Sequence, residues 1–136
     1  MQDVLTTTSP VALTDDYMLL PVESGFNWDD YFVSVDAGEW YLVVFRCKHR
    51  PDADEDAAAA ARIVPGLLVY FAGTPRVTGE CLSFCLWDSQ ASAQQGAAQS
   101  AHRKAAAIGV QWYEYYHLER YIIRKIASEV LFLRLI

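Results

Sequence analysis

One histidine stands among side chains that could carry out acid–base chemistry on a bound molecule. His102 lies near the start of the run AHRKAAAIGVQWYEYY, which has the composition of a helix. On a helical wheel of about 100° per residue, His102 shares a stripe with Tyr113 and Tyr116, and Trp112 lies at its edge. A histidine titrates near neutral pH, so His102 is a candidate base. The alternative is a structural histidine that only makes hydrogen bonds within the fold.

The middle of this stripe is made of small residues, Ala105, Ala106 and Gly109. Small residues between aromatic ones could leave a cavity between helix and sheet, which is the usual make-up of a small-molecule pocket. Side chains from other elements would then join Trp112 in holding an aromatic substrate; the full candidate set is Tyr70, Trp87, Trp112, Tyr113 and Tyr116. The same stripe could instead be filled as plain core. Arg76, in a predicted loop, could contact an anionic group or remain a solvated loop charge.

The histidines do not suggest a metal site. His49, His102 and His117 lack the close helical spacing of a zinc motif such as His-Glu-x-x-His. The sequence also lacks a phosphate-binding loop, the Rossmann glycines, a Gly-x-Ser-x-Gly elbow and a Cys-x-x-Cys pair. We therefore expect no metal and no tightly held cofactor, with a haem-binding variant as an alternative in which His102 or His117 is the axial ligand.

The three cysteines are expected to be reduced. Cys81 and Cys85 lie on one predicted strand with Cα atoms roughly 13 Å apart, whereas a disulfide needs them within about 7 Å. Cys47 stands alone in another strand. Small buried thiols without a disulfide framework are typical of a reducing compartment. The N-terminus has neither the basic nor the apolar region of a signal peptide, so we expect a cytoplasmic protein.

The charge and the apolar runs of the chain argue against nucleic acid and membranes as partners. Its formal net charge is -6, and it has no cluster of Lys and Arg, which argues against binding nucleic acid or anionic membranes. No apolar run approaches the roughly 20 residues that a membrane span needs. A chain of 136 residues is expected to form one domain.

The elements that must position these residues follow one another in a recognisable order. We predict strands over residues 39–49, 66–73, 80–87 and 117–126, and helices over 52–63, 89–99 and 101–116, the last two forming one long kinked helix. Strand, helix, strand, strand, helix, strand is the split βαβ order, an α+β ferredoxin-like fold. It predicts a four-stranded antiparallel sheet with both helices on one face.

Residues outside this order form two flanking segments. Residues 1–39 are an N-terminal extension, whose first 16 residues we expect to be a loose arm with a short helix later, near Trp28. Residues 40–126 form the ferredoxin-like domain. Residues 127–136 form a short fifth strand or a tail that docks on a partner.

Both faces of the predicted sheet are apolar. In the first strand Trp40, Leu42 and Val44 alternate with Tyr41, Val43 and Phe45, so each face carries a hydrophobic row. Helices on one face would leave the other as a large apolar patch, which monomers avoid. The alternation therefore predicts a homodimer through the sheet face.

The run SFCLWDSQASAQQGAAQSAHRKAA resembles a known family. Its Trp87-Asp88-Ser89 at a strand end and Ser100-Ala101-His102-Arg103 on the following helix are similar to the antibiotic-biosynthesis-monooxygenase-like members of the dimeric α+β barrel superfamily. The resemblance covers residues 40–126. It implies a dimeric α+β barrel and membership of a group that includes cofactor-independent oxygenases, haem-degrading enzymes, isomerases and proteins with no known reaction.

Three functions are consistent with these observations. The first is an oxygenase or isomerase that acts on an aromatic or polyketide-like compound, with His102 as its base. The second is a non-catalytic ligand-binding or structural homodimer, and the third is the haem-binding protein. A cavity that solvent can reach near His102 would favour the first, and a filled stripe would favour the second.

Overall fold

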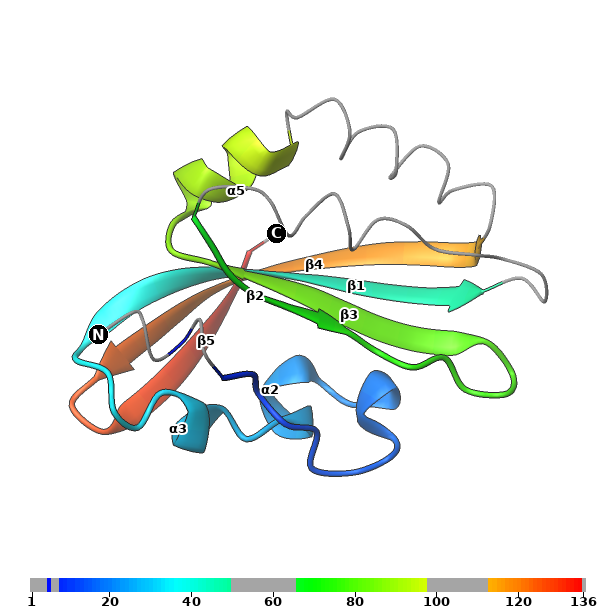
Figure 1. The fold of residues 1–136 in the computed structure, drawn as a ribbon, viewed down its shortest axis with the longest axis horizontal. Helices are drawn as coiled ribbons and strands as arrows, with labels where there is room; N and C mark the ends of the chain where they lie inside the picture. The colour runs from blue at the N-terminus through cyan, green and yellow to red at the C-terminus, as the bar shows by residue number, and fades with distance from the viewer. Residues whose placement is uncertain (1–4, 6–7, 50–65, 98–112, 136) are drawn as a thin grey trace.

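Five antiparallel strands form a single twisted sheet in the computed structural model, which describes residues 5, 8–49, 66–97 and 113–135 (Figure 1). The strands are β1 (Gly38–His49), β2 (Leu67–Ala72), β3 (Glu80–Trp87), β4 (Tyr113–Ile126) and β5 (Glu129–Leu135). Their order is β2-β3-β1-β4-β5, and every neighbouring pair is antiparallel. The first four strands confirm the predicted ferredoxin-like α+β fold. β5 extends the sheet beyond β4, so this segment is a strand.

Alternation along the strands divides the sheet into two faces, which we call the lower and upper faces after their places in Figure 1. The lower face carries Trp40, Leu42, Val44, Leu82, Phe84, Leu86, Tyr121 and Ile123. The upper face carries Tyr41, Val43, Phe45, Cys47, Cys81, Ser83, Cys85, Trp87, Leu118, Arg120 and Ile122. Both rows are largely apolar, as the alternation predicts.

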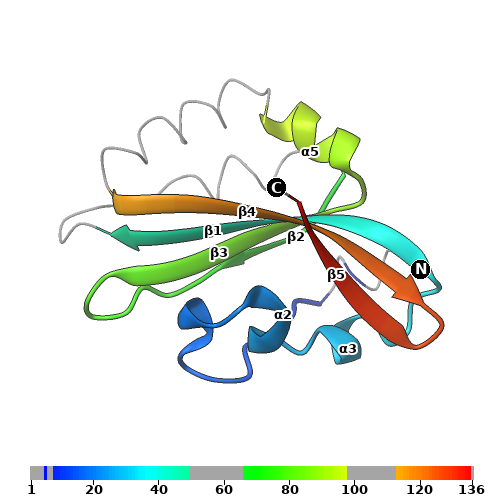
Figure 2. The ribbon, with the colours of Figure 1, turned by 180° about the vertical axis from the view of Figure 1, so that it is seen from behind.

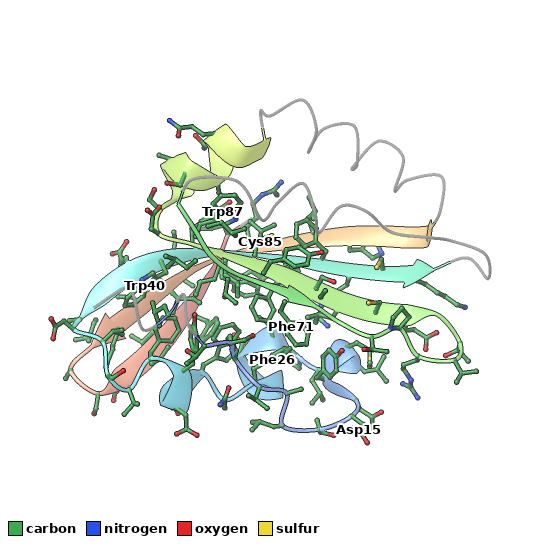
Figure 3. All side chains as sticks on the ribbon, viewed as in Figure 1. Asp15, Phe26, Trp40, Phe71, Cys85 and Trp87 are labelled. Carbon is green, nitrogen blue, oxygen red and sulfur yellow. The ribbon has the colours of Figure 1, made fainter. Side chains whose placement is uncertain are left out.

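The N-terminal segment covers the lower face. It contains three short helices, η1 (Tyr17–Leu19), α2 (Val22–Gly25) and α3 (Trp28–Tyr31), which lie below the sheet in both ribbon views (Figures 1 and 2). Phe26 stands at the centre of the contact (Figure 3), with its ring 5.1 Å from Phe71 and 5.2 Å from Phe84 between centroids. Edge-to-face packing of this kind adds to the hydrophobic gain of burial.

Two cations, the buried Lys125 and the partly buried Arg46, fasten this segment to the sheet. Lys125 of β4 donates from its ammonium to the carbonyls of Phe32 and Val35, both at 2.7 Å. The Arg46 guanidinium of β1 donates to the carbonyls of Met18 and Leu20 at 2.9 and 2.7 Å. These charge-assisted bonds hold carbonyls in and beside the short helices against the sheet.

One prediction about the N-terminal extension is wrong, and the argument for a homodimer loses its basis, although the homodimer itself stays a prediction. Its beginning is not a loose arm throughout, because Leu5 is fully buried and its carbonyl accepts a 2.6 Å hydrogen bond from the Tyr31 hydroxyl. The face that we expected to need a second copy is covered by residues of the same chain. The reason for predicting a homodimer through the sheet face therefore fails in this structure.

The upper face carries α5 (Gln90–Ala97), which lies above β1 and β3. The predicted helix over residues 52–63, and most of the one over 101–116, lie outside the described residues. Tyr113 and Tyr116, which the wheel placed on a helical stripe with His102, belong to β4, where they are register partners of His49 and Cys47. That placement was wrong because pairing with the long strand β1 outweighs the local helical pattern of these residues.

Candidate functional site

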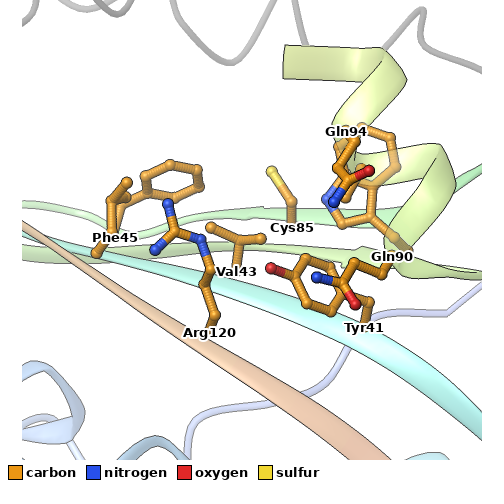
Figure 4. Close-up of a pocket in the computed structure, with 10 residues that line it drawn as sticks. Tyr41, Val43, Phe45, Cys85, Gln90, Gln94 and Arg120 are labelled. Atoms are coloured by element: carbon orange, nitrogen blue, oxygen red, sulfur yellow. The ribbon is translucent and has the colours of Figure 1, made fainter. Parts of the chain in front are cut away.

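A cavity of about 350 Å³ lies between the upper face and α5. Figure 4 shows its side chains arriving from β1, β3 and β4 below and from α5 beside them. Its floor is largely buried, and its rim is exposed to solvent. The lining residues are Tyr41, Val43, Phe45, Cys85, Trp87, Gln90, Ala93, Gln94, Leu118 and Arg120.

Strand register builds the floor in parallel rows. Val43 of β1 is flanked by Cys85 of β3 and Arg120 of β4. The neighbouring row places Tyr41 beside Trp87. Cross-strand partners on one face have Cβ atoms roughly 4.5–5.5 Å apart, so the floor is a continuous apolar surface with polar groups at fixed positions.

The start of α5 sets the position of the pocket wall. The Ser89 hydroxyl accepts a 3.2 Å hydrogen bond from the backbone N–H of Ser92, which is a helix N-cap. Gln90, Ala93 and Gln94 follow at i, i+3 and i+4 spacing, so they share the helix face that borders the cavity. The small side chain of Ala93 keeps this wall low and leaves room for a ligand.

The turn before β2 supports the same helix. Gly66 has φ of +87° and its carbonyl accepts a 2.9 Å hydrogen bond from the Asp88 N–H. A Cβ at this position would come within 2.4 Å of the Ser92 hydroxyl oxygen. Both the backbone conformation and the close approach require glycine.

The titratable groups of the pocket are proton donors at neutral pH. Burial raises the pKa of the Tyr41 hydroxyl, and the nearby charge of Arg120 opposes that rise only in part. Burial also raises the pKa of the Cys85 thiol to about 12, so this thiol is not a nucleophile. Among the described lining residues the pocket thus combines a neutral phenol, a neutral thiol, a guanidinium and two amides.

This arrangement favours a flat apolar molecule that carries an oxyanion. Trp87, Phe45 and Leu118 provide aromatic and aliphatic surface. Arg120 lies at the exposed rim, and no ion pair within the described part of the chain engages it. A phenolate, enolate or carboxylate beside Arg120 and the Tyr41 hydroxyl would gain charge-assisted hydrogen bonds.

The predicted site residues are distributed unevenly in the structure. Trp87 lines the cavity, and Tyr70 packs against the cluster of Tyr41, Cys85 and Trp87 that forms its floor. Arg76 lies in the loop between β2 and β3 and is not among the lining residues; its guanidinium is 3.7 Å from the Asp16 carboxylate.

Other candidates cannot be placed at the cavity. His102 and Trp112 lie outside the described residues, so their roles stay predictions. For Tyr113 and Tyr116 the structure describes the backbone of β4 and not the side chains. His117 is exposed and is the register partner of Arg46, which places it on the lower-face side of β4.

Sequence reasoning missed Tyr41, Gln90, Gln94 and Arg120 as pocket residues. A signal for Tyr41 was available, because alternation already placed it on the same face as Val43 and Phe45. Arg120 gave no distinct signal, because it is one of several charged residues in β4. The two glutamines gave none, because polar residues on a short helix usually face solvent.

The described residues form neither a metal site nor a membrane-spanning helix. No group of three or more histidine, cysteine or acidic side chains is placed to hold a metal ion in the ranges given above. No helix in the described part of the chain is long and apolar enough to cross a membrane.

The match to a family model covers nearly the whole chain. The model of the PB2B2.08-like family matches residues 2–134. The chain belongs to the PB2B2.08-like family. This match includes the N-terminal segment as well as the sheet. Sequence comparison with curated proteins gave no match.

Solved structures show the wider relationship of the fold. A putative antibiotic biosynthesis monooxygenase from Chloroflexus aurantiacus is 18% identical, with a TM-score of 0.52 over 66% of this chain and 96% of the other. SnoaB, a cofactor-independent oxygenase from Streptomyces nogalater, is 15% identical, with a TM-score of 0.55 over 67% of this chain and 98% of the other. Rv0793 from Mycobacterium tuberculosis is 17% identical, with a TM-score of 0.51 over 60% and 91%. These likenesses confirm the fold of antibiotic-biosynthesis-monooxygenase-like proteins.

Proposed function

We propose that this PB2B2.08-like protein binds a small aromatic compound with an acidic hydroxyl or carboxyl group, and acts on it as an oxygenase or isomerase. The observation that carries this proposal is the cavity under α5, where an apolar floor meets the Tyr41 hydroxyl and the Arg120 guanidinium. Its volume of about 350 Å³ is in the range of small-molecule sites. The likeness in fold to SnoaB supports the reaction class by analogy.

The chemistry of the pocket agrees with such a reaction. A cofactor-independent oxygenase must hold its substrate as an electron-rich anion, and an isomerase passes through an enolate. Arg120 and the protonated Tyr41 would stabilise that oxyanion, which is the electrostatic part of catalysis. The described lining residues offer no base at neutral pH, and His102 remains the candidate for that role.

A non-catalytic binding protein is the second candidate. It is favoured by the same absence of a base among the described lining residues, because a pocket of donors and apolar surface can bind an anion without transforming it. The two candidates share the ligand and differ in whether it is transformed, either with consumption of dioxygen by an oxygenase or by transfer of a proton within the substrate by an isomerase.

Binding is tested with 2-naphthoate as an aromatic anion and 2-naphthamide as its neutral counterpart, by isothermal titration calorimetry. Wild type should bind the anion more tightly, and Arg120→Met should weaken that binding about tenfold, the equivalent of one charge-assisted bond at an exposed rim. Arg124→Met is the matched control, since Arg124 lies on the same strand and face, outside the cavity, paired with Glu39. It should leave binding unchanged.

Two further measurements separate the alternatives. Ala93→Phe should fill the cavity and abolish binding while the far-ultraviolet circular dichroism spectrum stays native. Equal affinity for the anion and the amide, or equal losses in the two arginine variants, would refute the binding site. Oxygen uptake with an electron-rich polycyclic phenol, lost in His102→Ala, would support the oxygenase; binding without any turnover would favour the non-catalytic protein.

A further inference from the structure

Cys47 and Cys81 are direct neighbours across two strands of the sheet. They are register partners in the antiparallel pairing of β1 and β3, and both lie on the upper face. Their exposed fractions are 4% and 3%, and they form a small buried cluster of their own. Neither is in a disulfide in this structure.

The register places the two cysteines within disulfide range. Directly opposed residues in an antiparallel pair have Cα atoms about 4.5 or 5.5 Å apart, depending on the hydrogen-bonding site. Disulfides span Cα separations of about 4.4–6.8 Å. Both kinds of opposed position therefore place the Cα atoms within disulfide range without a change in strand register.

The Cys47 thiol lies toward β3, and the Cys81 thiol is turned away from it, toward the residue that follows β2. The Cys47 thiol approaches the carbonyl oxygen of Cys81 at 4.0 Å, so its side chain lies across β3. The Cys81 thiol donates to the Gly73 carbonyl at 3.3 Å, and rotation about its side-chain bond would release it. Because a thiol is a weak hydrogen-bond donor, losing this hydrogen bond is a small barrier to forming a disulfide.

The third cysteine has no such partner. Cys85 is opposed by Val43 on one side and by Tyr70 on the other. It stands four residues from Cys81 on the same strand, where the separation is too large for a disulfide. The geometry thus selects one connectivity among the three cysteines.

We propose that Cys47 and Cys81 are a redox modification site that forms a reversible cross-strand disulfide. The oxidant is a low-molecular-weight disulfide of the glutathione type. In a transient local opening of the sheet, one of the two thiols reaches solvent and loses its proton. The thiolate attacks this disulfide and releases one small thiol, giving a mixed disulfide. The second protein thiolate then displaces the second small thiol. Overall, two protein thiols and one small disulfide yield one protein disulfide and two small thiols.

The disulfide would link β1 to β3 on the upper face of the sheet, next to the cavity. Phe45, which lines the cavity, and its partner Ser83 form the adjacent pair on this face. A link between residues 47 and 81 would also close the intervening chain into a loop, which restricts the unfolded state. The oxidised protein should therefore resist unfolding more than the reduced one.

The test is disulfide mapping of the native wild-type protein. The folded protein is equilibrated with glutathione disulfide, blocked with an alkylating reagent and digested without reduction. The expected result is a peptide that joins Cys47 to Cys81, an intact mass lower by two hydrogen atoms, and an upward shift of the melting temperature. Dithiothreitol should reverse all three. The connectivity is determined on the wild-type chain, so it does not depend on any variant folding.

Single-cysteine variants provide the matched comparison. Cys85→Ala should keep the cross-link, and Cys47→Ala or Cys81→Ala should lose it. A link to Cys85, a link between two chains, or glutathione adducts without a cross-link would overturn the proposal. Full alkylation of both thiols after prolonged exposure to the oxidant would overturn it as well.

Discussion

Replacing Lys125 by methionine should loosen the N-terminal segment from the sheet. Lys125 is 7% exposed, and its ammonium donates to three backbone carbonyls, those of Phe32, Val33 and Val35, at 2.7, 3.3 and 2.7 Å. Methionine fills nearly the same volume, so the main effect of Lys125→Met is the loss of these bonds and not a new cavity.

The size of the effect follows from the two short bonds. Hydrogen bonds to a charged group contribute about 1.5–3 kcal/mol each, and the third, longer bond adds little. We therefore expect Lys125→Met to lower the free energy of unfolding by about 3–5 kcal/mol, a large share of the roughly 5–15 kcal/mol that holds a domain folded. The assay is equilibrium urea unfolding monitored by circular dichroism.

The adjacent residue on the same strand supplies the control. Arg124 faces the upper side and makes an exposed ion pair with Glu39 at 2.8 Å. Arg124→Met should cost no more than about 1 kcal/mol. A loss in Lys125→Met that does not exceed the loss in Arg124→Met would refute the idea that the buried ammonium fastens the segment.

The same variant also tests how the lower face is covered. If the segment is the cover, loosening it exposes Trp40, Leu42 and Val44, and the protein should begin to self-associate. Sedimentation velocity would show a monomeric wild type and larger species for Lys125→Met. A wild-type dimer that the substitution leaves intact would mean that copies associate through a different surface.

Two further variants test the acid stability of the fold and the support of the pocket. Burial alone would raise the pKa of Glu119, but hydrogen bonds from Tyr121 and Arg46, with the charge of Arg46, hold that pKa below its ordinary value of 4.5. The carboxylate therefore stabilises the fold above about pH 4.5, and this contribution disappears as the pH falls through the lowered pKa. Glu119→Gln should remove this pH dependence from the free energy of unfolding. If urea unfolding at pH values from 7 to 3 gave the same acid-induced loss of stability in Glu119→Gln and in wild type, Glu119 would not be its source. Gly66→Ala should destabilise the protein by about 1–2 kcal/mol, because alanine at positive φ is strained, and should weaken 2-naphthoate binding by displacing α5. Gly38→Ala, where the new Cβ meets only an ordinary contact at 3.4 Å, is its control, and equal effects in the two variants would rule out the explanation.

Local patterning accounts for most of the sheet. The predicted strand over 80–87 matches β3 in both bounds, and β1 begins one residue before the predicted strand. β1 is rich in β-branched and aromatic residues, and β3 in large apolar ones. Turn residues lie beside both runs, so this information is held within a few positions of the chain.

Residues 113–116 show where local patterning fails. The run YEYY continues a helical pattern, but in the structure it pairs with residues 47–49 of β1. The stabilising partner lies more than sixty residues away in sequence, so a window of local pattern does not contain it. The pairing of Cys47 with Cys81 escaped prediction for the same reason.

Local patterning likewise indicated some residues of the candidate site and not others. The alternation of Tyr41, Val43 and Phe45 placed them on one face, and Trp87 was a predicted ligand contact; Arg120 joins them only through the register of β4 against β1.

By itself, the sequence determined the order of the strands along the chain, the two apolar faces and the ferredoxin-like class, because alternation and turn chemistry act over neighbouring residues. Only the tertiary structure decided what covers each face. The lower face could be buried equally well by a second copy or by the chain's own extension, since hydrophobic burial is non-directional. The contacts of Phe26 and the carbonyls that Lys125 and Arg46 bind show that the extension occupies it, which leaves the upper face to carry the pocket.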